Sequence, residues 1–180
     1  MRGELIEDDV RCVGRHGDEV DTGAGEPSDG VHEVLDQRGS IVLHEADAEP
    51  EVEAVDDEAR ARGLRRLALL GTRFTMEAPF YPAAFARRGI AIVPPDDQDR
   101  PWVHERYLGE LVPGVFKDET RERFVALIER LKAETGIDGV ILGGTELPIL
   151  LQAPVVAGLP MLDTTELHVQ AIVSEARRRT

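Results

Sequence analysis

A glycine pair followed by two polar residues is the stretch of the sequence best suited to chemistry. Gly143 and Gly144 come directly after a short apolar run at residues 140–142, and Thr145 and Glu146 follow them. Glycine permits positive φ and a close approach of the backbone at the end of a strand. Thr145 can cap a following helix, and Glu146 would lie in the first turn of that helix, where the helix dipole favours an anion. The stretch therefore predicts a ligand-binding turn between a buried strand and a helix.

Alternating strands and helices must hold this turn in place. Apolar runs typical of buried parallel strands occur at residues 67–70, 90–93, 140–142 and 159–162. Helical spacing and end signals predict helices at residues 76–88, 99–111, 118–135, 147–151 and 164–178. The order predicts an α/β lobe with a flavodoxin-like parallel four-stranded sheet and flanking helices. Ligands of such sheets bind at the carboxyl ends of strands, so the glycine turn is the preferred site.

The chain changes character near residue 60. The first 60 residues carry 19 Asp and Glu against five Arg, and all eight aromatic residues lie after residue 73. High charge without aromatic residues is typical of a segment that cannot bury a core. We therefore predict an acidic, largely disordered segment at 1–60, with a solvated linker at 45–58, followed by a folded lobe at 61–180.

Composition also excludes several functions. The net charge of −14 argues against binding of nucleic acid, which needs basic patches. No apolar run approaches the roughly 20 residues that span a bilayer, and the acidic N-terminus favours a cytoplasmic location. The single cysteine, Cys12, excludes an internal disulfide and a cysteine-based zinc cluster.

Four motifs together resemble the aspartate/glutamate racemase family. The stretch Leu142-Gly143-Gly144-Thr145-Glu146-Leu147-Pro148 is similar to the second catalytic motif of that family, L-G-C-T-E-[IL]-P. Three further similarities lie in the expected order, at residues 69–76 with Phe80-Tyr81 after them, at residues 116–121 and at residues 162–168. The resemblance runs from about residue 64 to about residue 176.

The resemblance implies a reaction and a missing group. The family has two α/β lobes, each of which supplies one base, and an amino acid loses its Cα proton on one face and regains a proton on the other without pyridoxal phosphate or another cofactor. Only the C-terminal lobe is recognisable in this sequence, and the catalytic cysteine of the motif falls on Gly144. The resemblance also implies substrate contacts at Thr72, Thr75 and Lys117, beside Thr145 and Glu146.

Each of these side chains also has a purely structural interpretation. Thr145 could donate to a substrate carboxylate or only cap a helix, and Glu146 could bind a substrate ammonium or only supply a first-turn charge. Thr72 and Thr75 could contact substrate or only form a turn. Lys117 could meet the acidic group of a substrate or be a solvated loop residue.

Three other residues are expected to be structural. Asp163 is predicted to cap the last helix, and His168 to be a half-buried residue of that helix. Cys12 lies in the acidic segment and is not expected to replace the missing base.

Three interpretations of function remain open. The first is an amino-acid racemase acting on a small acidic amino acid, impaired or inactive because Gly144 lacks the thiol. The second is a non-catalytic α/β module that binds a small anion or a protein partner, with a possible homodimer through an uncovered face. The third concerns residues 1–60, which could come from a shifted reading frame or a misplaced start.

Overall fold

The computed structural model describes residues 34–35, 41–42 and 45–179, which fall into two compact units, Met1–His44 and Glu45–Thr180. In the first unit, β1 (Val34–Leu35) pairs with β2 (Ile41–Val42) in an antiparallel manner. The rest of residues 1–44, for which disorder is predicted, lies outside the described residues, whereas residues 45–60 belong to the second unit. The second unit contains all the other helices and strands described here.

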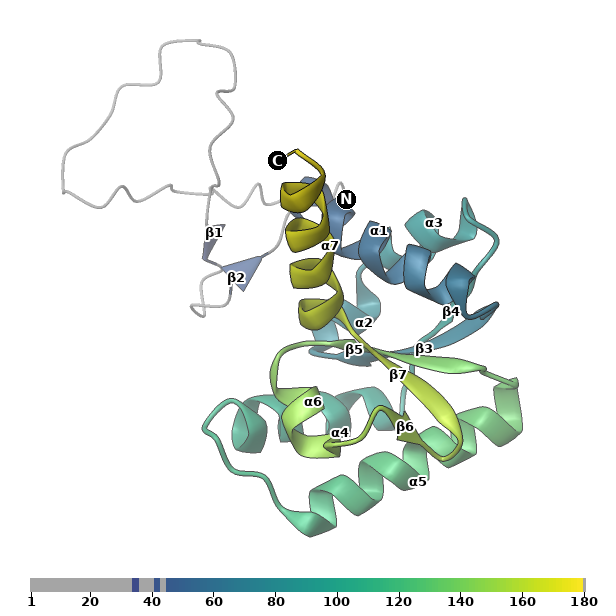
Figure 1. Cartoon of the computed structure of the whole chain (residues 1–180). Helices are drawn as coiled ribbons and strands as arrows, with labels where there is room; N and C mark the ends of the chain where they lie inside the picture. The colour runs from purple at the N-terminus through teal and green to yellow at the C-terminus, as the bar shows by residue number, and fades with distance from the viewer. Residues whose placement is uncertain (1–33, 36–40, 43–44, 180) are drawn as a thin grey trace, which may run out of the picture. The chain divides into compact units, whose positions relative to one another are not determined.

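A five-stranded sheet forms the centre of the second unit (Figure 1). Its order is β4-β3-β5-β7-β6, and β3, β4, β5 and β7 are parallel. Numbered along the chain, the parallel strands have the order 2-1-3-4, which is the flavodoxin-like order. The predicted α/β fold is therefore confirmed. The bounds are β3 (Arg66–Gly71), β4 (Ala91–Val93), β5 (Gly139–Gly143), β6 (Val155–Val156) and β7 (Leu159–Asp163).

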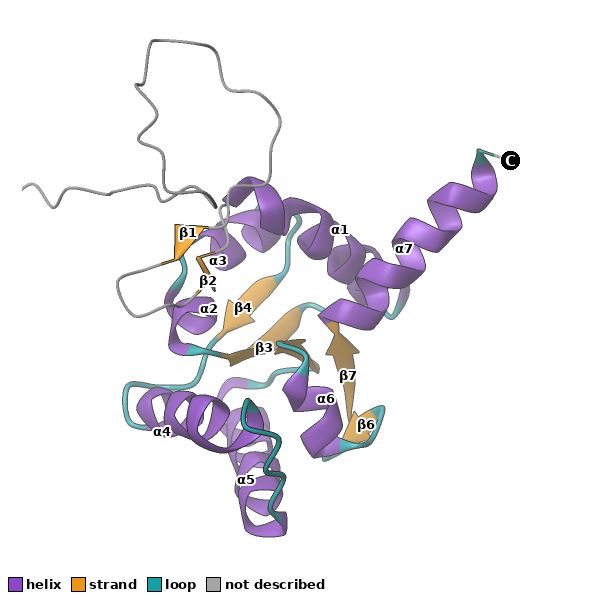
Figure 2. Ribbon diagram, turned by 90° about the vertical axis from the view of Figure 1, so that its left-hand side faces the viewer, coloured by secondary structure: helices purple, strands orange, loops and turns teal. Residues whose placement is uncertain are grey.

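Helices cover both faces of this sheet (Figures 1 and 2). Apolar side chains of β3 and β5 alternate between the two faces, so Leu67 and Leu69 pack on one side while Ala68 and Leu70 pack on the other. The first face is covered by α1 (Glu45–Ala61), α3 (Phe80–Ala86) and α7 (Thr164–Arg178). The second is covered by α4 (Asp99–Arg106), η1 (Tyr107–Leu111), α5 (Asp118–Thr135) and α6 (Glu146–Leu151), and short α2 (Arg73–Glu77) follows β3.

Helix α1 overturns the predicted linker at residues 45–58. Val52, Val55 and Ala59 are 2%, 0% and 0% exposed and pack into the core on the first face. Their spacing of three and four residues places them on one side of a helix. Asp56 is buried with them and pairs with Arg60 and Arg88. The compact unit therefore begins at Glu45 rather than at residue 61.

Other differences from the predicted elements are local. The helix expected at residues 76–88 is divided into α2 and α3 beside Pro79, and the helix expected at 99–111 ends in the π-helical turn η1. The fifth strand, β6, was not predicted; it pairs with β7 in an antiparallel hairpin. Asp163 caps α7 as predicted, since its carboxylate accepts from the backbone N–H groups of Thr165 and Glu166. No helix among residues 45–179 is both long and apolar enough to cross a bilayer.

Candidate functional site

The carboxyl ends of β3, β5 and β7 lie side by side at one edge of the sheet. Strand pairing places Gly71 opposite Gly143 and Leu142 opposite Asp163. Because β5 lies between β3 and β7, the turn that follows it is at the centre of this edge. The structure thus places the glycine turn where ligands of open α/β sheets bind.

Packing rather than backbone conformation explains the glycines at these strand ends. Neither Gly143 nor Gly144 has the positive φ that glycine permits. A Cβ on Gly143 would lie 2.9 Å from Thr75 Cγ2 and 3.0 Å from the carbonyl oxygen of Leu70. A Cβ on Gly71 would lie 2.7 Å from the carbonyl oxygen of Gly143. Neither glycine uses the positive φ that its type permits, whereas a close approach does occur, between neighbouring strands.

Gly144, at the position of the motif's cysteine, lies against the ring of Tyr107. A Cβ on Gly144 would lie 2.7 Å from Tyr107 Cζ and 3.0 Å from Tyr107 Cε2, and closer still to the hydroxyl oxygen. The Tyr107 hydroxyl donates a hydrogen bond to the carboxylate of Glu146. A tyrosine therefore occupies the space into which a side chain at position 144 would project.

The Tyr107–Glu146 pair has a defined protonation state at neutral pH. Burial, followed by the hydrogen bond and negative charge of Glu146, raises the pKa of the Tyr107 hydroxyl. Burial alone would raise the pKa of Glu146, but hydrogen bonds involving Tyr107, Thr145 and the backbone outweigh it and hold the pKa below its ordinary value. The phenol therefore keeps its proton and the carboxylate is ionised, so the phenol is the donor.

Thr72 and Thr75 form a compact turn at the end of β3. The Thr72 hydroxyl oxygen accepts from the backbone N–H of Thr75 at 3.3 Å, and the two hydroxyl oxygens are 3.1 Å apart. Thr72 is thus the N-cap of α2. Thr145 differs, because it precedes α6 without a side-chain capping bond. The capping interpretation fits Thr72 but not Thr145.

Lys117 lies in a different environment from the other predicted residues. Its Nζ is 3.0 Å from Glu110 Oε1, and the same carboxylate accepts from Thr120 Oγ1 at 2.6 Å and from Arg106 at 2.6 Å. These donors, with Thr120 first, lower the pKa of Glu110 to about 2. In the described part of the chain, the Lys117 ammonium group therefore binds the buried carboxylate of Glu110. The structure gathers Gly144, Thr72, Thr75, Thr145 and Glu146 at the ends of β3 and β5, and places Lys117 on Glu110.

Two aromatic residues of α4 and η1 were not predicted at the site. Tyr107 is 5% exposed and lies in the core with Val103 and Leu111, four residues before and after it. His104 Nδ1 accepts from the backbone N–H of Arg73 at 3.1 Å, directly after Thr72. Burial and the charge of Arg73 lower the pKa of His104, which favours the neutral ring. The sequence shows only that Tyr107 shares an apolar helix face, so its partner at position 144 could not be foreseen.

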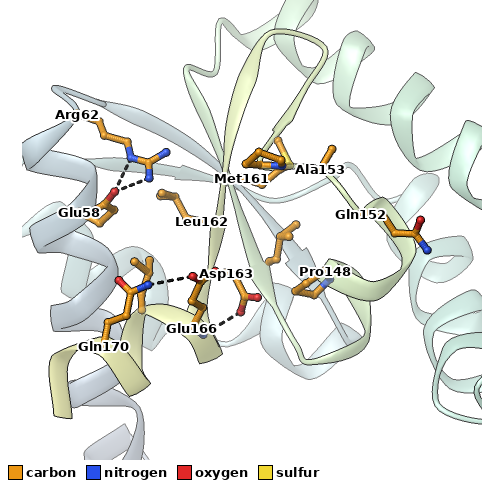
Figure 3. Close-up of a pocket in the computed structure, with 13 residues that line it drawn as sticks. Glu58, Arg62, Pro148, Gln152, Ala153, Met161, Leu162, Asp163, Glu166 and Gln170 are labelled. Atoms are coloured by element: carbon orange, nitrogen blue, oxygen red, sulfur yellow. Dashed lines mark hydrogen bonds and ion pairs between the residues drawn. The ribbon is translucent and has the colours of Figure 1, made fainter. Parts of the chain in front are cut away.

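A cavity of about 430 Å³ is lined in part by residues that flank the turn, Leu142 before it and Pro148 after it. Pro148 from the glycine motif and Asp163 from the end of β7 contribute to its wall, together with the ion pair between Glu58 and Arg62 (Figure 3). None of the six predicted site residues lines this cavity. The strand ends therefore remain the candidate site, and the cavity borders them.

Residues 52–172 match the family model described as Asp/Glu/Hydantoin racemase. The chain belongs to this racemase family. The matched region begins within α1, in agreement with the place of this helix in the folded lobe.

Two solved structures are similar to this chain over more than two thirds of its length. An aspartate racemase homologue from Pyrococcus horikoshii OT3 is 35% identical, with a TM-score of 0.66, and the match covers 71% of this chain and 55% of that one. A putative Asp/Glu racemase from Yersinia pestis is 33% identical, with a TM-score of 0.65, and the match covers 70% of this chain and 54% of that one. This chain thus matches just over half the length of each relative, which fits the predicted C-terminal lobe.

Proposed function

We propose that this chain is a racemase-type lobe that binds a small acidic amino acid at the ends of β3 and β5, and that it racemises this ligand slowly or not at all. The observation that carries the proposal is the glycine at position 144, against which Tyr107 lies. The motif around it is otherwise that of a racemase. The residues around position 144 are kept, while the cysteine that would carry the proton is missing. We call the part of the active site that this lobe supplies, at the ends of β3 and β5, the half-site.

The chemistry of inversion explains why the missing group matters. A group on one face removes the Cα proton while a protonated group on the other face returns one, so two opposed carriers are needed. Gly144 offers no ionisable side chain. The nearby phenol of Tyr107 keeps its proton at neutral pH, because its pKa is raised. Neither Gly144 nor Tyr107 therefore supplies a group suited to removing the Cα proton.

The polar groups at the strand ends suit an acidic amino acid. The ionised carboxylate of Glu146 could bind an ammonium group, and the hydroxyls of Thr72, Thr75 and Thr145 could donate to carboxylates. Lys117 would have to exchange its bond with Glu110 for a bond to the substrate. We therefore expect weak binding, and we infer that no organic cofactor is required.

Racemisation and binding can be measured separately. We expect that purified chain leaves the circular dichroism of L-aspartate and L-glutamate solutions unchanged, while calorimetry or ligand-observed NMR detects weak binding of the same amino acids. Robust turnover would contradict the proposed loss of activity. Absence of binding at millimolar ligand would contradict the proposed substrate class.

A non-catalytic module is the second candidate, favoured by apolar side chains on the surface of α7. Val169, Ile172 and Val173 are 53%, 54% and 42% exposed, and their spacing places them on one face of the helix. Such a stripe is typical of a surface that contacts a partner. For this candidate we propose a homodimer through this face of α7. The cytoplasmic location expected from composition stays a prediction.

A further inference from the structure

Two adjacent glycines at the end of β5 are required for different reasons. The atoms that a Cβ on Gly143 would meet include the carbonyl oxygen of Leu70 in the neighbouring strand, which cannot move without disturbing the sheet. The three nearest atoms to a Cβ on Gly144 all belong to the side chain of Tyr107. The φ of Gly144 is not positive, so the backbone itself would accept another residue there. A single side chain therefore imposes glycine at position 144.

Tyr107 is held in this place from two sides. Its ring is packed in the core with Val103 and Leu111, and only 5% of the residue is exposed. Its hydroxyl is bound to Glu146, which lies in the first turn of α6 and 39 residues away in the sequence. Leaving this position would break the hydrogen bond and expose the ring to water, both of which cost free energy.

We propose that Tyr107 is the steric replacement for the side chain missing at position 144, and that Tyr107 and Glu146 together hinder the binding of an amino acid at the half-site, so that it binds only weakly. The first part rests on the contact between Tyr107 and Gly144 and on the hydrogen bond from Tyr107 to Glu146. The second part rests on the proposed function, because it assumes that an acidic amino acid is the ligand. In that case the ligand ammonium must displace the phenol from Glu146, and the ligand must enter space that the ring fills.

A double-mutant cycle tests the steric part. Gly144→Ala is combined with Tyr107→Leu, which shortens the side chain but keeps apolar volume, and unfolding in urea is followed for the four proteins. We expect Gly144→Ala to lower the folding equilibrium constant strongly in the natural background and far less with Tyr107→Leu, a coupling of about tenfold or more. Equal losses in both backgrounds would overturn the proposal.

A second tyrosine provides the matched control. Tyr81 is 4% exposed and packs in the core on the opposite face of the sheet, stacked on Phe85. Tyr81→Leu should combine with Gly144→Ala additively, within about twofold, because distant sites do not couple. If Gly144→Ala alone fails to fold, rescue of folding by Tyr107→Leu supports the proposal. Failure of both the single and the double variant overturns it, because removing the ring would then not relieve the clash.

Calorimetry with L-aspartate and L-glutamate tests the second part. Tyr107→Leu should bind at least several-fold more tightly than the natural chain, since the space opens and Glu146 loses its internal donor. An unchanged or weaker affinity would overturn the claim that Tyr107 and Glu146 hinder binding. Strong coupling in the cycle without binding by any variant would support the steric part and contradict the proposed ligand class, so the two failures are distinguishable.

Discussion

At the scale of single residues, the candidate site is defined by what stands at position 144. The position itself could be identified from the sequence, because the surrounding motif is local and nearly complete. Its neighbour could not, since Tyr107 reaches Gly144 only through the packing of η1 against α6. In the sequence, Tyr107 has the spacing of an ordinary core residue with Val103 and Leu111. A contact between residues far apart in the chain, such as Tyr107 and Gly144, leaves no recognisable pattern in the local sequence.

Glu110 gives a prediction about pH at the same scale. This carboxylate is 6% exposed and accepts from Thr120, Arg106 and Lys117, and its pKa lies at about 2 rather than the ordinary 4.5. A lowered pKa stabilises the fold above the unfolded value and loses that effect as the pH falls. Glu110→Gln should therefore lower the free energy of unfolding by about 2 kcal/mol near neutral pH and by much less near the folded pKa.

Urea unfolding at about pH 6 and about pH 2.5 measures this difference. Glu119→Gln is the matched control, because Glu119 is an exposed carboxylate in the first turn of α5. This control removes one negative charge without disturbing the buried network. A Glu110→Gln effect of the same size at both pH values would contradict the prediction.

At the scale of elements, the four parallel strands could be predicted because each is a compact apolar run bounded by turn residues. Two elements could not. Strand β6 has two residues, too few for any alternation. Helix α1 has eight acidic residues among its 17, and the charged composition obscured Val52, Val55 and Ala59 on one face. The average hydropathy of a segment thus says less about folding than the position of a few small apolar side chains.

Val55 tests whether α1 is an integral part of the lobe. Val55 is fully buried against the sheet, so Val55→Ala should destabilise the chain by about 2 kcal/mol through the lost methyl groups and the cavity. Asp57→Ala, at an exposed position two residues later, should change stability by less than about 0.5 kcal/mol. Thermal or urea unfolding measures both. If the two variants behaved alike, α1 would not be packed on the sheet in solution.

At the scale of the whole molecule, charge and exposed apolar surface act in opposite directions. The net charge of −14 disfavours association between copies, whereas the stripe of Val169, Ile172 and Val173 favours it. Salt screens the repulsion and leaves the apolar contact intact. We therefore expect a dimer whose population rises with both protein concentration and ionic strength.

Light scattering coupled to size-exclusion chromatography measures this association. Val169→Lys should shift the population to monomer, because it places a charge within the apolar stripe. Val155→Lys is the matched control, since Val155 is a valine of similar exposure, 56% against 53%, on a different element. A natural chain that stays monomeric at high concentration and high salt would contradict the dimer.

The small hairpin of β6 and β7 has a consequence for colloidal behaviour. β6 stops after two residues, at a tight reversal in which Ala157 and Gly158 have φ of 52° and 71°. Lys132 Nζ stabilises this turn by donating a hydrogen bond to the carbonyl oxygen of Ala157 at 2.8 Å. A long, flat edge strand would offer a template for strands of other molecules, whereas an edge strand of two residues does not. Edge-to-edge pairing with the sheets of other molecules, as in fibril growth, is therefore disfavoured at the β6 edge of the sheet.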